Sequence, residues 1–178
     1  QTSLIPILEN QLNLSTDVGK EVYTKFKFVV QFLKTDPRAR YQGHSFYFRE
    51  GFCWNNILNP QARLLKAKIK SISVNDVGSM SLYSAYSYSP NFYIVTAINS
   101  NFLFTYYREF INCTVNIQIN DIRQLPIIIP TEEQLNICKQ LFDSMICLKS
   151  STSSQNNKED ADLLENKLDS FVSELYSI

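Results

Sequence analysis

The sequence has 178 residues, of which 44% are hydrophobic and 19% are charged. This length fits about one domain, and the apolar fraction is sufficient for a core, which excludes a chain that is disordered throughout. No apolar run approaches the roughly 20 residues that a membrane-spanning helix requires, and no secretory signal segment opens the sequence. The sequence begins with Gln1 instead of Met, so we expect it to be part of a longer protein.

The 17 basic and 17 acidic residues cancel formally, but they are unevenly distributed along the chain. Residues 34–70 hold eight basic and two acidic residues, which gives a net charge of +6. Residues 131–178 hold four basic and nine acidic residues, which gives a net charge of −5. Because local charge determines the potential that a polyanion experiences, the basic block is a candidate DNA-binding surface. The alternative is that the two blocks pair with each other on a solvated surface.

The cysteine and histidine content argues against a metal site. The sequence has no CxxC pair, and the single histidine, His44, cannot complete a Cys/His zinc site. The four cysteines are Cys53, Cys113, Cys138 and Cys147. Their spacing favours reduced, buried thiols in a cytoplasmic protein.

The first predicted elements are two strands joined by a basic loop. Phenylalanines and lysines alternate in Thr24–Leu33, which predicts a strand that runs into buried chain. A turn follows at residues 35–37, where a proline disfavours the helical region for the residue before it. Residues 38–43 form a polar, basic loop, and Phe46–Arg49 is the second predicted strand.

The clearest predicted strand is Leu64–Ser73, in which Lys66, Lys68 and Lys70 share one face. Same-face residues along a strand are roughly 6.6–6.8 Å apart, which is close to the ~6.8 Å that two phosphate steps of one DNA strand span along the duplex axis. The three lysines are therefore candidates for contacting a DNA backbone. Alternatively, they protect an exposed strand from edge-to-edge aggregation.

Residues 77–90 are rich in serine and tyrosine. Tyr83, Tyr86 and Tyr88 are separated by small residues, so the loop could offer hydroxyl groups and flat rings to phosphates and bases. The alternative is a half-buried loop with ordinary core tyrosines.

The middle of the chain is apolar and its secondary structure is ambiguous. Residues 91–110 are interrupted at Asn99-Ser100-Asn101; propensity favours two strands, whereas the length and the break permit two short helices. Periodicity does not decide between them. Thr114–Asn120 alternates regularly, which predicts a strand with its valine and isoleucines directed inward.

Two helices are predicted at the end of the chain. Thr131 and Gln134 form a capping box, and the helix that it opens extends to about Leu148. Residues 151–157 are a polar linker, and an acidic amphipathic helix follows over residues 158–178. The apolar stripe of this last helix is Leu164, Leu168, Phe171, Val172 and Leu175.

The sequence offers no catalytic centre. Its four glycines do not form a loop that could cradle a phosphate or a cofactor, and no clustered carboxylates accompany the lysines as a metal-dependent nuclease requires. Cys53 lies beside Trp54, a setting more typical of a core than of a nucleophile. We therefore expect this fragment to be no enzyme and to bind no cofactor or metal, and a standalone nuclease is disfavoured.

Three segments, in this order and spacing, together resemble one family. Phe46–Trp54 (FYFREGFCW) resembles the start of target-recognition domains in bacterial DNA adenine methyltransferases and single-chain restriction-modification enzymes. Asn116–Pro126 (NIQINDIRQLP), followed by Ile129–Gln134 (IPTEEQ), is similar to a second segment of that family. Leu164–Tyr176 is similar to the segment that closes many of the single-chain enzymes.

The resemblance implies the C-terminal specificity domain of a Taq-type DNA adenine-N6 methyltransferase or type II restriction enzyme. In that family, the segment matching Ile94–Phe104 is a pair of short helices, which would meet here at Asn99-Ser100. The S-adenosylmethionine site and the pocket for a flipped adenine would belong to a catalytic half of the same chain. The parent protein could be a methyltransferase alone, a fused restriction-modification enzyme with an endonuclease, or a phage-defence methyltransferase.

We therefore expect an α+β fold with a curved, mostly antiparallel sheet, a short helix pair and two C-terminal helices. The predicted organisation is a DNA target-recognition domain over residues 1–150, a linker over 151–157, and a helix over 158–178 that packs on the domain. The expected partners are double-stranded DNA and the catalytic half of the same chain, with no membrane. We expect a monomer.

The predicted DNA-binding residues are Arg38, Arg40, Gln42, Lys66, Lys68, Lys70, Tyr83, Tyr86 and Tyr88. The lysines would position phosphates, with support from the tyrosines. The arginines and the glutamine would read base edges, because arginine pairs with guanine and glutamine with adenine in the major groove. A second hypothesis is a protein-interaction module whose C-terminal helices dock a methyltransferase or restriction subunit.

Overall fold

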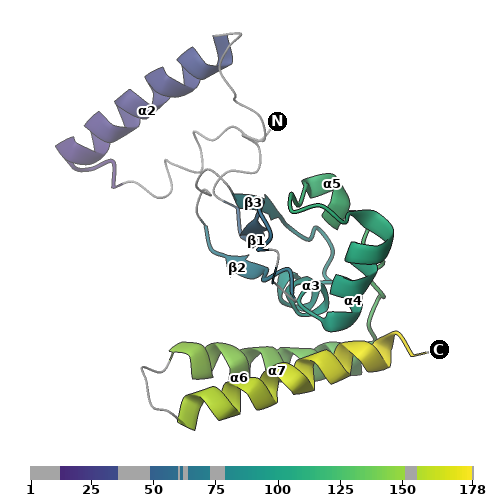
Figure 1. The fold of residues 1–178 in the computed structure, drawn as a ribbon. Coiled ribbons are helices and arrows are strands. Elements are labelled where there is room, and N and C mark those ends of the chain that lie inside the picture. The colour runs from purple at the N-terminus through teal and green to yellow at the C-terminus, as the bar shows by residue number, and fades with distance from the viewer. Residues whose placement is uncertain are drawn as a thin grey trace. The chain divides into compact units, whose positions relative to one another are not determined.

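The computed structural model describes residues 13–35, 49–59, 61, 64–72, 79–150 and 156–177. The chain divides into two compact units, Gln1–Arg49 with Ser71–Val74 and Glu50–Lys70 with Asn75–Ile178. The described helices and strands form an α+β fold, as expected (Figure 1). None of the helices in the described ranges has the length and apolar character needed to span a membrane. The domain boundaries around residues 151–157 stay predictions.

In the first unit, the described element is α2, a helix over Asp17–Thr35. The strand predicted for Thr24–Leu33 was therefore wrong. The N–H of Gly19 donates to Oγ1 of Thr16 at 3.1 Å, which caps the helix start. Valines and phenylalanines recur every three to four residues over the whole segment, and this helical period outweighs an alternation that covers only a few residues.

The second unit contains a sheet of three short antiparallel strands. The central strand β1 (Gly51–Asn55) is flanked by β2 (Lys68–Lys70) and β3 (Ser79–Leu82). The antiparallel sheet is thus confirmed. Phe52 and Trp54 of β1 are both at least 95% buried and direct one face of the sheet into the core.

The helix pair expected from the resemblance is confirmed. Helix α3 (Asn91–Ile98) is followed by α4 (Asn101–Tyr106), and the π-helix η2 (Tyr107–Ile111) continues α4. Ser100 lies between the two α-helices, and its Oγ accepts a hydrogen bond from the N–H of Leu103 at 3.2 Å. This side chain therefore caps α4 and fixes the junction.

The strand predicted for Thr114–Asn120 was wrong. This segment makes one isolated bridge, through Asn116 to Ile57, and then enters the short helix α5 (Ile119–Ile122). A capping box at the start of α5 favours the helix locally. Alternation predicted that Val115, Ile117 and Ile119 face inward; Ile117 is 0% exposed and Ile119 packs against the core, as predicted, but Val115 is 43% exposed.

The two C-terminal helices are confirmed and pack as an antiparallel hairpin. Helix α6 covers Glu132–Ser150 and α7 covers Asn156–Leu175; the two run side by side in Figure 1. The capping box of α6 forms as expected. The N–H of Thr131 donates to Oε1 of Gln134 at 2.8 Å, and the N–H of Gln134 donates to Oγ1 of Thr131 at 3.2 Å.

Two clusters of buried side chains hold the second unit together. The larger cluster packs the sheet against α3 and α4, whereas the smaller joins α3 to the hairpin through Tyr93, Cys138, Phe171 and Val172. The predicted apolar stripe of α7 is partly used in this way, because Phe171 and Val172 are 9% and 0% exposed. The remaining members of the stripe, Leu164, Leu168 and Leu175, are half-buried.

Candidate nucleic-acid interface

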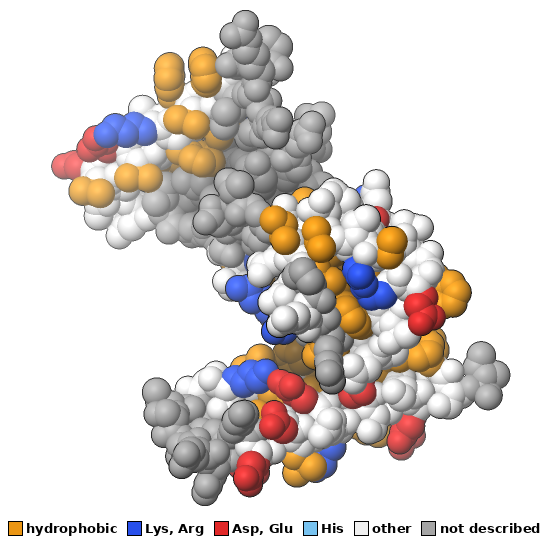
Figure 2. Space-filling model, in the orientation of Figure 1, with side chains coloured by type: hydrophobic (Ala, Val, Ile, Leu, Met, Phe, Trp, Pro, Cys, Tyr) orange, Lys and Arg blue, Asp and Glu red, His pale blue; other side chains and the backbone are white. Residues whose placement is uncertain are grey.

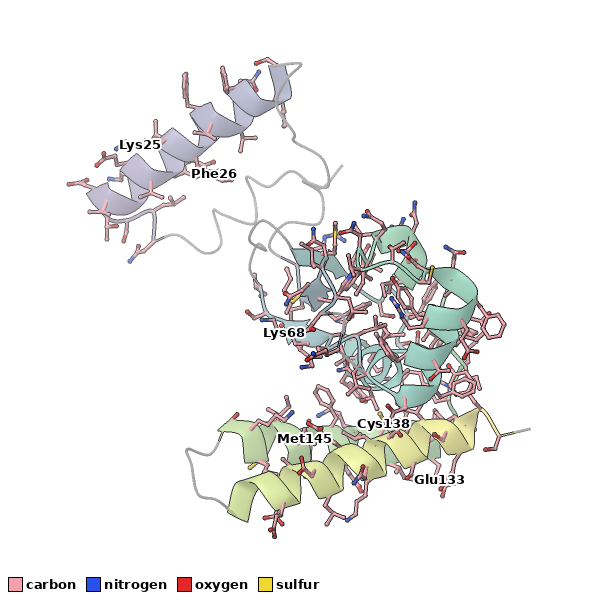
Figure 3. All side chains as sticks on the ribbon, viewed as in Figure 1. Lys25, Phe26, Lys68, Glu133, Cys138 and Met145 are labelled. Carbon is pink, nitrogen blue, oxygen red and sulfur yellow. The ribbon has the colours of Figure 1, made fainter. Side chains whose placement is uncertain are left out.

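Two of the predicted lysines lie at the start of β2, Lys66 just before the strand and Lys68 as its first residue. Lys66 and Lys68 are exposed, whereas Leu65 and Ala67 are only 3% and 6% exposed. Figure 3 labels Lys68 on β2. Neither lysine forms an ion pair with the described residues of α6 and α7. These two charges therefore do not support a pairing between the basic and acidic blocks of the sequence.

The prediction that Lys70 belongs to the same exposed surface was wrong. The register pairs Cys53 with Lys68 and Gly51 with Lys70, so the two lysines are directed to the same face of the sheet. Lys70 is nevertheless only 6% exposed. Burial lowers the pKa of Lys70, and the Cys53 thiol acts in the opposite direction. This burial makes Lys70 a weaker candidate for a phosphate contact than Lys66 and Lys68.

Asn99, which ends α3, fixes the backbone between the two exposed lysines. Its Oδ1 accepts a hydrogen bond from the N–H of Ala67 at 2.7 Å, and its Nδ2 donates to the carbonyl of Ala67 at 2.8 Å. The side-chain amide thus satisfies both backbone groups of Ala67, as a neighbouring strand would. The preceding residue, Lys66, has a left-handed φ of 54°, which is uncommon for a side chain of this size.

Tyr86 and Tyr88 form an exposed aromatic pair in the loop after β3. Their ring centroids are 5.0 Å apart with an interplanar angle of 19°, and the two residues are 60% and 46% exposed. Tyr83 is half-buried, so it presents less of its ring to solvent. Exposed, flat rings can stack on nucleobases, and their hydroxyl groups can bond to phosphates.

The tyrosine loop is fixed to the start of α3. The N–H of Ser84 donates to Oδ1 of Asn91 at 2.8 Å, and Asn91 is the first residue of α3. Within the loop, the N–H of Tyr86 donates to Oγ of Ser84 at 3.3 Å, and the N–H of Ser89 donates to the carbonyl of Tyr86 at 3.2 Å. The loop that carries the aromatic pair therefore has a defined conformation.

The exposed lysines and the aromatic pair are consequently attached to opposite ends of one helix. Asn91 and Asn99 are separated by about 12 Å along α3, given a rise of ~1.5 Å per residue. Val95, Ala97 and Ile98 are at most 4% exposed, so the helix between the two asparagines is packed into the core. Sequence reasoning did not identify either asparagine as functional. The available signal was a polar residue at each end of an apolar helical segment.

The residues predicted to read base edges lie outside the described residues. Arg38, Arg40 and Gln42 belong to residues 36–48, as do the proline of the predicted turn and most of the predicted strand Phe46–Arg49. Their role in base recognition stays a prediction.

The described residues include buried titratable groups but no cluster of metal ligands. Within these ranges, no three His, Cys, Asp or Glu side chains are placed to hold a metal ion. Burial raises the pKa of Tyr93 and Cys138, and it raises the pKa of Tyr107 to about 12 with a contribution from the Asp121 carboxylate. These shifts move the pKa values further above pH 7, whereas a general acid or base needs a pKa near the working pH.

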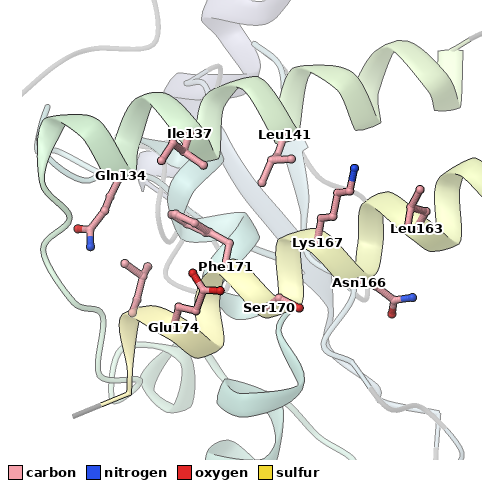
Figure 4. A pocket seen from close by; sticks show the side chains of 10 residues that line it. Gln134, Ile137, Leu141, Leu163, Asn166, Lys167, Ser170, Phe171 and Glu174 are labelled. Carbon is pink, nitrogen blue, oxygen red and sulfur yellow. The ribbon is translucent and has the colours of Figure 1, made fainter.

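A groove between α6 and α7 is a second candidate site (Figure 4). It has a volume of about 500 Å³, and Ile137 and Leu163 on its lining are 43% and 54% exposed. Lys149 and Glu165 connect the two helices by an ion pair of 2.8 Å. Acidic side chains gather over the hairpin in the lower part of Figure 2. Such a groove could receive an apolar element of another protein.

Comparison with models of known protein families and with the sequences of curated proteins yields no match for this chain.

Proposed function

We propose that the chain is a sequence-specific, double-stranded DNA recognition module of a bacterial DNA adenine methyltransferase or restriction-modification enzyme, without the catalytic half. The observation that carries this proposal is the attachment of two kinds of DNA-binding group to one buried helix. Lys66 and Lys68 are held near one end of α3, and Tyr86 and Tyr88 near the other. β2 lies at the edge of the described sheet, so protection of that edge from aggregation is the alternative role of Lys66 and Lys68; only DNA contact predicts weaker duplex binding when both charges are reversed.

The sequence resemblance supports the same proposal independently. It led to the expectation of two short helices meeting at Asn99-Ser100, an expectation that strand propensity opposed. The described α3 and α4 meet at this position. A resemblance that anticipates local structure against propensity is better support than a resemblance of sequence alone.

In the proposed mechanism, phosphate contacts position the module and base contacts select the sequence. Lys66 and Lys68 bind the backbone of the duplex, and Tyr86 and Tyr88 add hydroxyl and ring contacts. Arg38, Arg40 and Gln42 contact base edges in the major groove. The catalytic half of the parent chain binds S-adenosylmethionine and receives the target adenine, which leaves the duplex for the reaction.

The experiment that tests this proposal is a titration of the full 178-residue chain into a fluorescently labelled random-sequence duplex at low salt. We expect binding by the unmodified chain and weaker binding by the Lys66→Glu, Lys68→Glu double variant. The control is the Lys139→Glu, Lys167→Glu double variant, which changes the net charge equally on the acidic hairpin. Absence of binding by the unmodified chain, or equal loss in both variants, would argue against the proposal.

A second assay tests which residues recognise the base sequence. In a selection from randomised duplexes, Arg38→Ala and Arg40→Ala should change the preferred sequence more than the affinity. An equal loss of affinity on every duplex would count against direct base recognition by these residues.

A second candidate function is a protein-interaction module that docks a methyltransferase or restriction subunit through α6 and α7. The groove with the exposed Ile137 and Leu163 favours this function. The burial of Phe171 and Val172 inside the same unit leaves less apolar surface for it. If the hairpin docks the catalytic half, Leu163→Asp should abolish co-purification of the two halves while DNA binding by the isolated chain is retained.

A further inference from the structure

Resting on the proposed DNA binding, we propose that Asn99 is a positioning residue for the phosphate contacts. By bonding both backbone groups of Ala67, it sets the directions in which Lys66 and Lys68 leave the chain. Asn99 itself would not contact DNA.

Asn99 bonds to both the N–H and the carbonyl of Ala67. Both hydrogen bonds, at 2.7 and 2.8 Å, join Asn99 to the residue between the two lysines, 32 positions away in sequence. Ala67 precedes β2, so no ladder partner in the described sheet satisfies its N–H and carbonyl. The Asn99 amide takes that place and defines the orientation of the peptide units on either side of Ala67.

The backbone of Lys66 has an unfavourable, left-handed conformation. A φ of 54° is unfavourable for a residue with a β-carbon, and such a conformation persists where the surroundings enforce it. Leu65 and Ala67 are buried on either side, and the Ala67 peptide is bonded to Asn99. Without the Asn99 amide, Lys66 could relax to an extended conformation, which would redirect its side chain relative to Lys68.

Asn99 lies at the C-terminal end of α3. At the other end of the helix, Asn91 accepts a hydrogen bond from Ser84 of the tyrosine loop at 2.8 Å. The separation of about 12 Å along the helix is similar to the rise of three to four base pairs along a duplex axis, at ~3.4 Å each. The helix thus holds the two attachment points, Asn91 and Asn99, at a fixed separation.

The experiment compares Asn99→Ala with Asn101→Ala in the full chain. Asn101 is the control at the same helix junction: its Nδ2 donates to Oδ2 of Asp169 in α7 at 2.8 Å, a side-chain bond that Asn101→Ala removes, while its backbone N–H, which donates to Oδ1 of Asp169 at 2.7 Å, is retained. For each protein, the melting temperature and the salt dependence of binding to a random-sequence duplex are measured. The amide exchange rate of Ala67 reports directly on its bond to Asn99.

We expect both variants to melt at lower temperature, but only Asn99→Ala to alter the salt dependence. In this variant, the slope of the logarithm of the binding constant against the logarithm of the salt concentration should become shallower by roughly one. Each lost phosphate contact removes about 0.9 from that slope. The exchange of the Ala67 amide should accelerate in this variant alone. Adding the Lys66→Glu and Lys68→Glu changes should then have a smaller effect than in the unmodified chain, because the affected contacts are shared.

Three results would overturn the inference. A folded Asn99→Ala variant with an unchanged slope would show a purely structural role. An equal change of slope in both asparagine variants would show general destabilisation. If Asn99→Ala does not fold, Asn99→Ser is measured, and an unchanged slope there has the same meaning. Failure of the unmodified chain to bind the duplex is a distinct outcome that rejects the proposed function itself.

Discussion

Asp169 of α7 accepts two hydrogen bonds from Asn101 at the start of α4, one from the N–H at 2.7 Å and one from Nδ2 at 2.8 Å. The two residues are 68 positions apart, so this contact ties the C-terminal hairpin to the helix pair. A carboxylate at the first turn of a helix also interacts favourably with the helix dipole. The hairpin is therefore attached to the body of the second unit by polar contacts as well as by its apolar face.

We expect Asp169→Ala to lower the free energy of unfolding by about 1–2 kcal/mol, because it leaves the backbone N–H and the side-chain amide of Asn101 without their acceptor. Urea denaturation provides the measurement. Asp162→Ala removes an exposed carboxylate from the same helix and should change the stability by less than about 0.5 kcal/mol. Similar losses in the two variants would mean that the Asn101 contact contributes little.

The core and the hairpin groove should respond differently to the loss of a leucine side chain. Leu103 is 0% exposed and packs in the larger cluster, so Leu103→Ala should cost about 2–5 kcal/mol of stability. Leu163 is 54% exposed, and Leu163→Ala should cost less than about 0.5 kcal/mol. Thermal unfolding of both variants tests the contrast, and a large cost at Leu163 would contradict its placement on the groove surface.

The four thiols should separate into two classes on alkylation near pH 8. The prediction of buried thiols is correct for Cys53 and Cys138 but wrong for Cys113 and Cys147, which are exposed. Burial also raises the pKa of Cys138, which keeps it as the unreactive neutral thiol. Mass spectrometry should detect two modified cysteines in the folded protein and four after denaturation. Rapid modification of Cys138 in the folded protein would contradict the packing between α3 and the hairpin.

Ionisation of Tyr107 should lower the stability of the fold in alkaline solution. Its pKa is raised from 10.0 to about 12, first by burial and then by the nearby Asp121 carboxylate. The folded state therefore retains the proton more strongly than the unfolded state, and the stabilisation is lost as the pH rises from about 10 towards 12. In urea titrations at increasing pH, Tyr107→Phe should show a shallower decline than the unmodified chain. Parallel declines would show that Tyr107 ionises normally.

The elements that sequence analysis predicted correctly depend on local interactions or on the family resemblance. The capping box of α6 joins Thr131 and Gln134, which are three residues apart, so both partners are visible in the sequence. The helix pair at Asn99-Ser100 was predictable only from the resemblance, because the periodicity of the apolar segment was ambiguous.

The incorrect predictions relied on short alternations or on spacing alone. The alternation in Thr24–Leu33 lies inside a longer helical period, and most of Thr114–Asn120 is irregular chain that ends in the short helix α5. The spacing of Lys66, Lys68 and Lys70 predicted a shared face, but it contains no information about burial, and Lys70 is buried. The bonds from Asn99 to Ala67 span 32 residues, and no local pattern indicates such a pair.

The proposed contacts of Lys66 and Lys68 with DNA phosphates are tested by the salt dependence of duplex binding. The logarithm of the binding constant should fall linearly with the logarithm of the salt concentration. In the Lys66→Glu, Lys68→Glu variant the slope should be shallower by about 1.8, because each phosphate contact contributes roughly 0.9. The Lys139→Glu, Lys167→Glu control should retain the original slope. An unchanged slope in the Lys66 and Lys68 variant would contradict the proposed contacts.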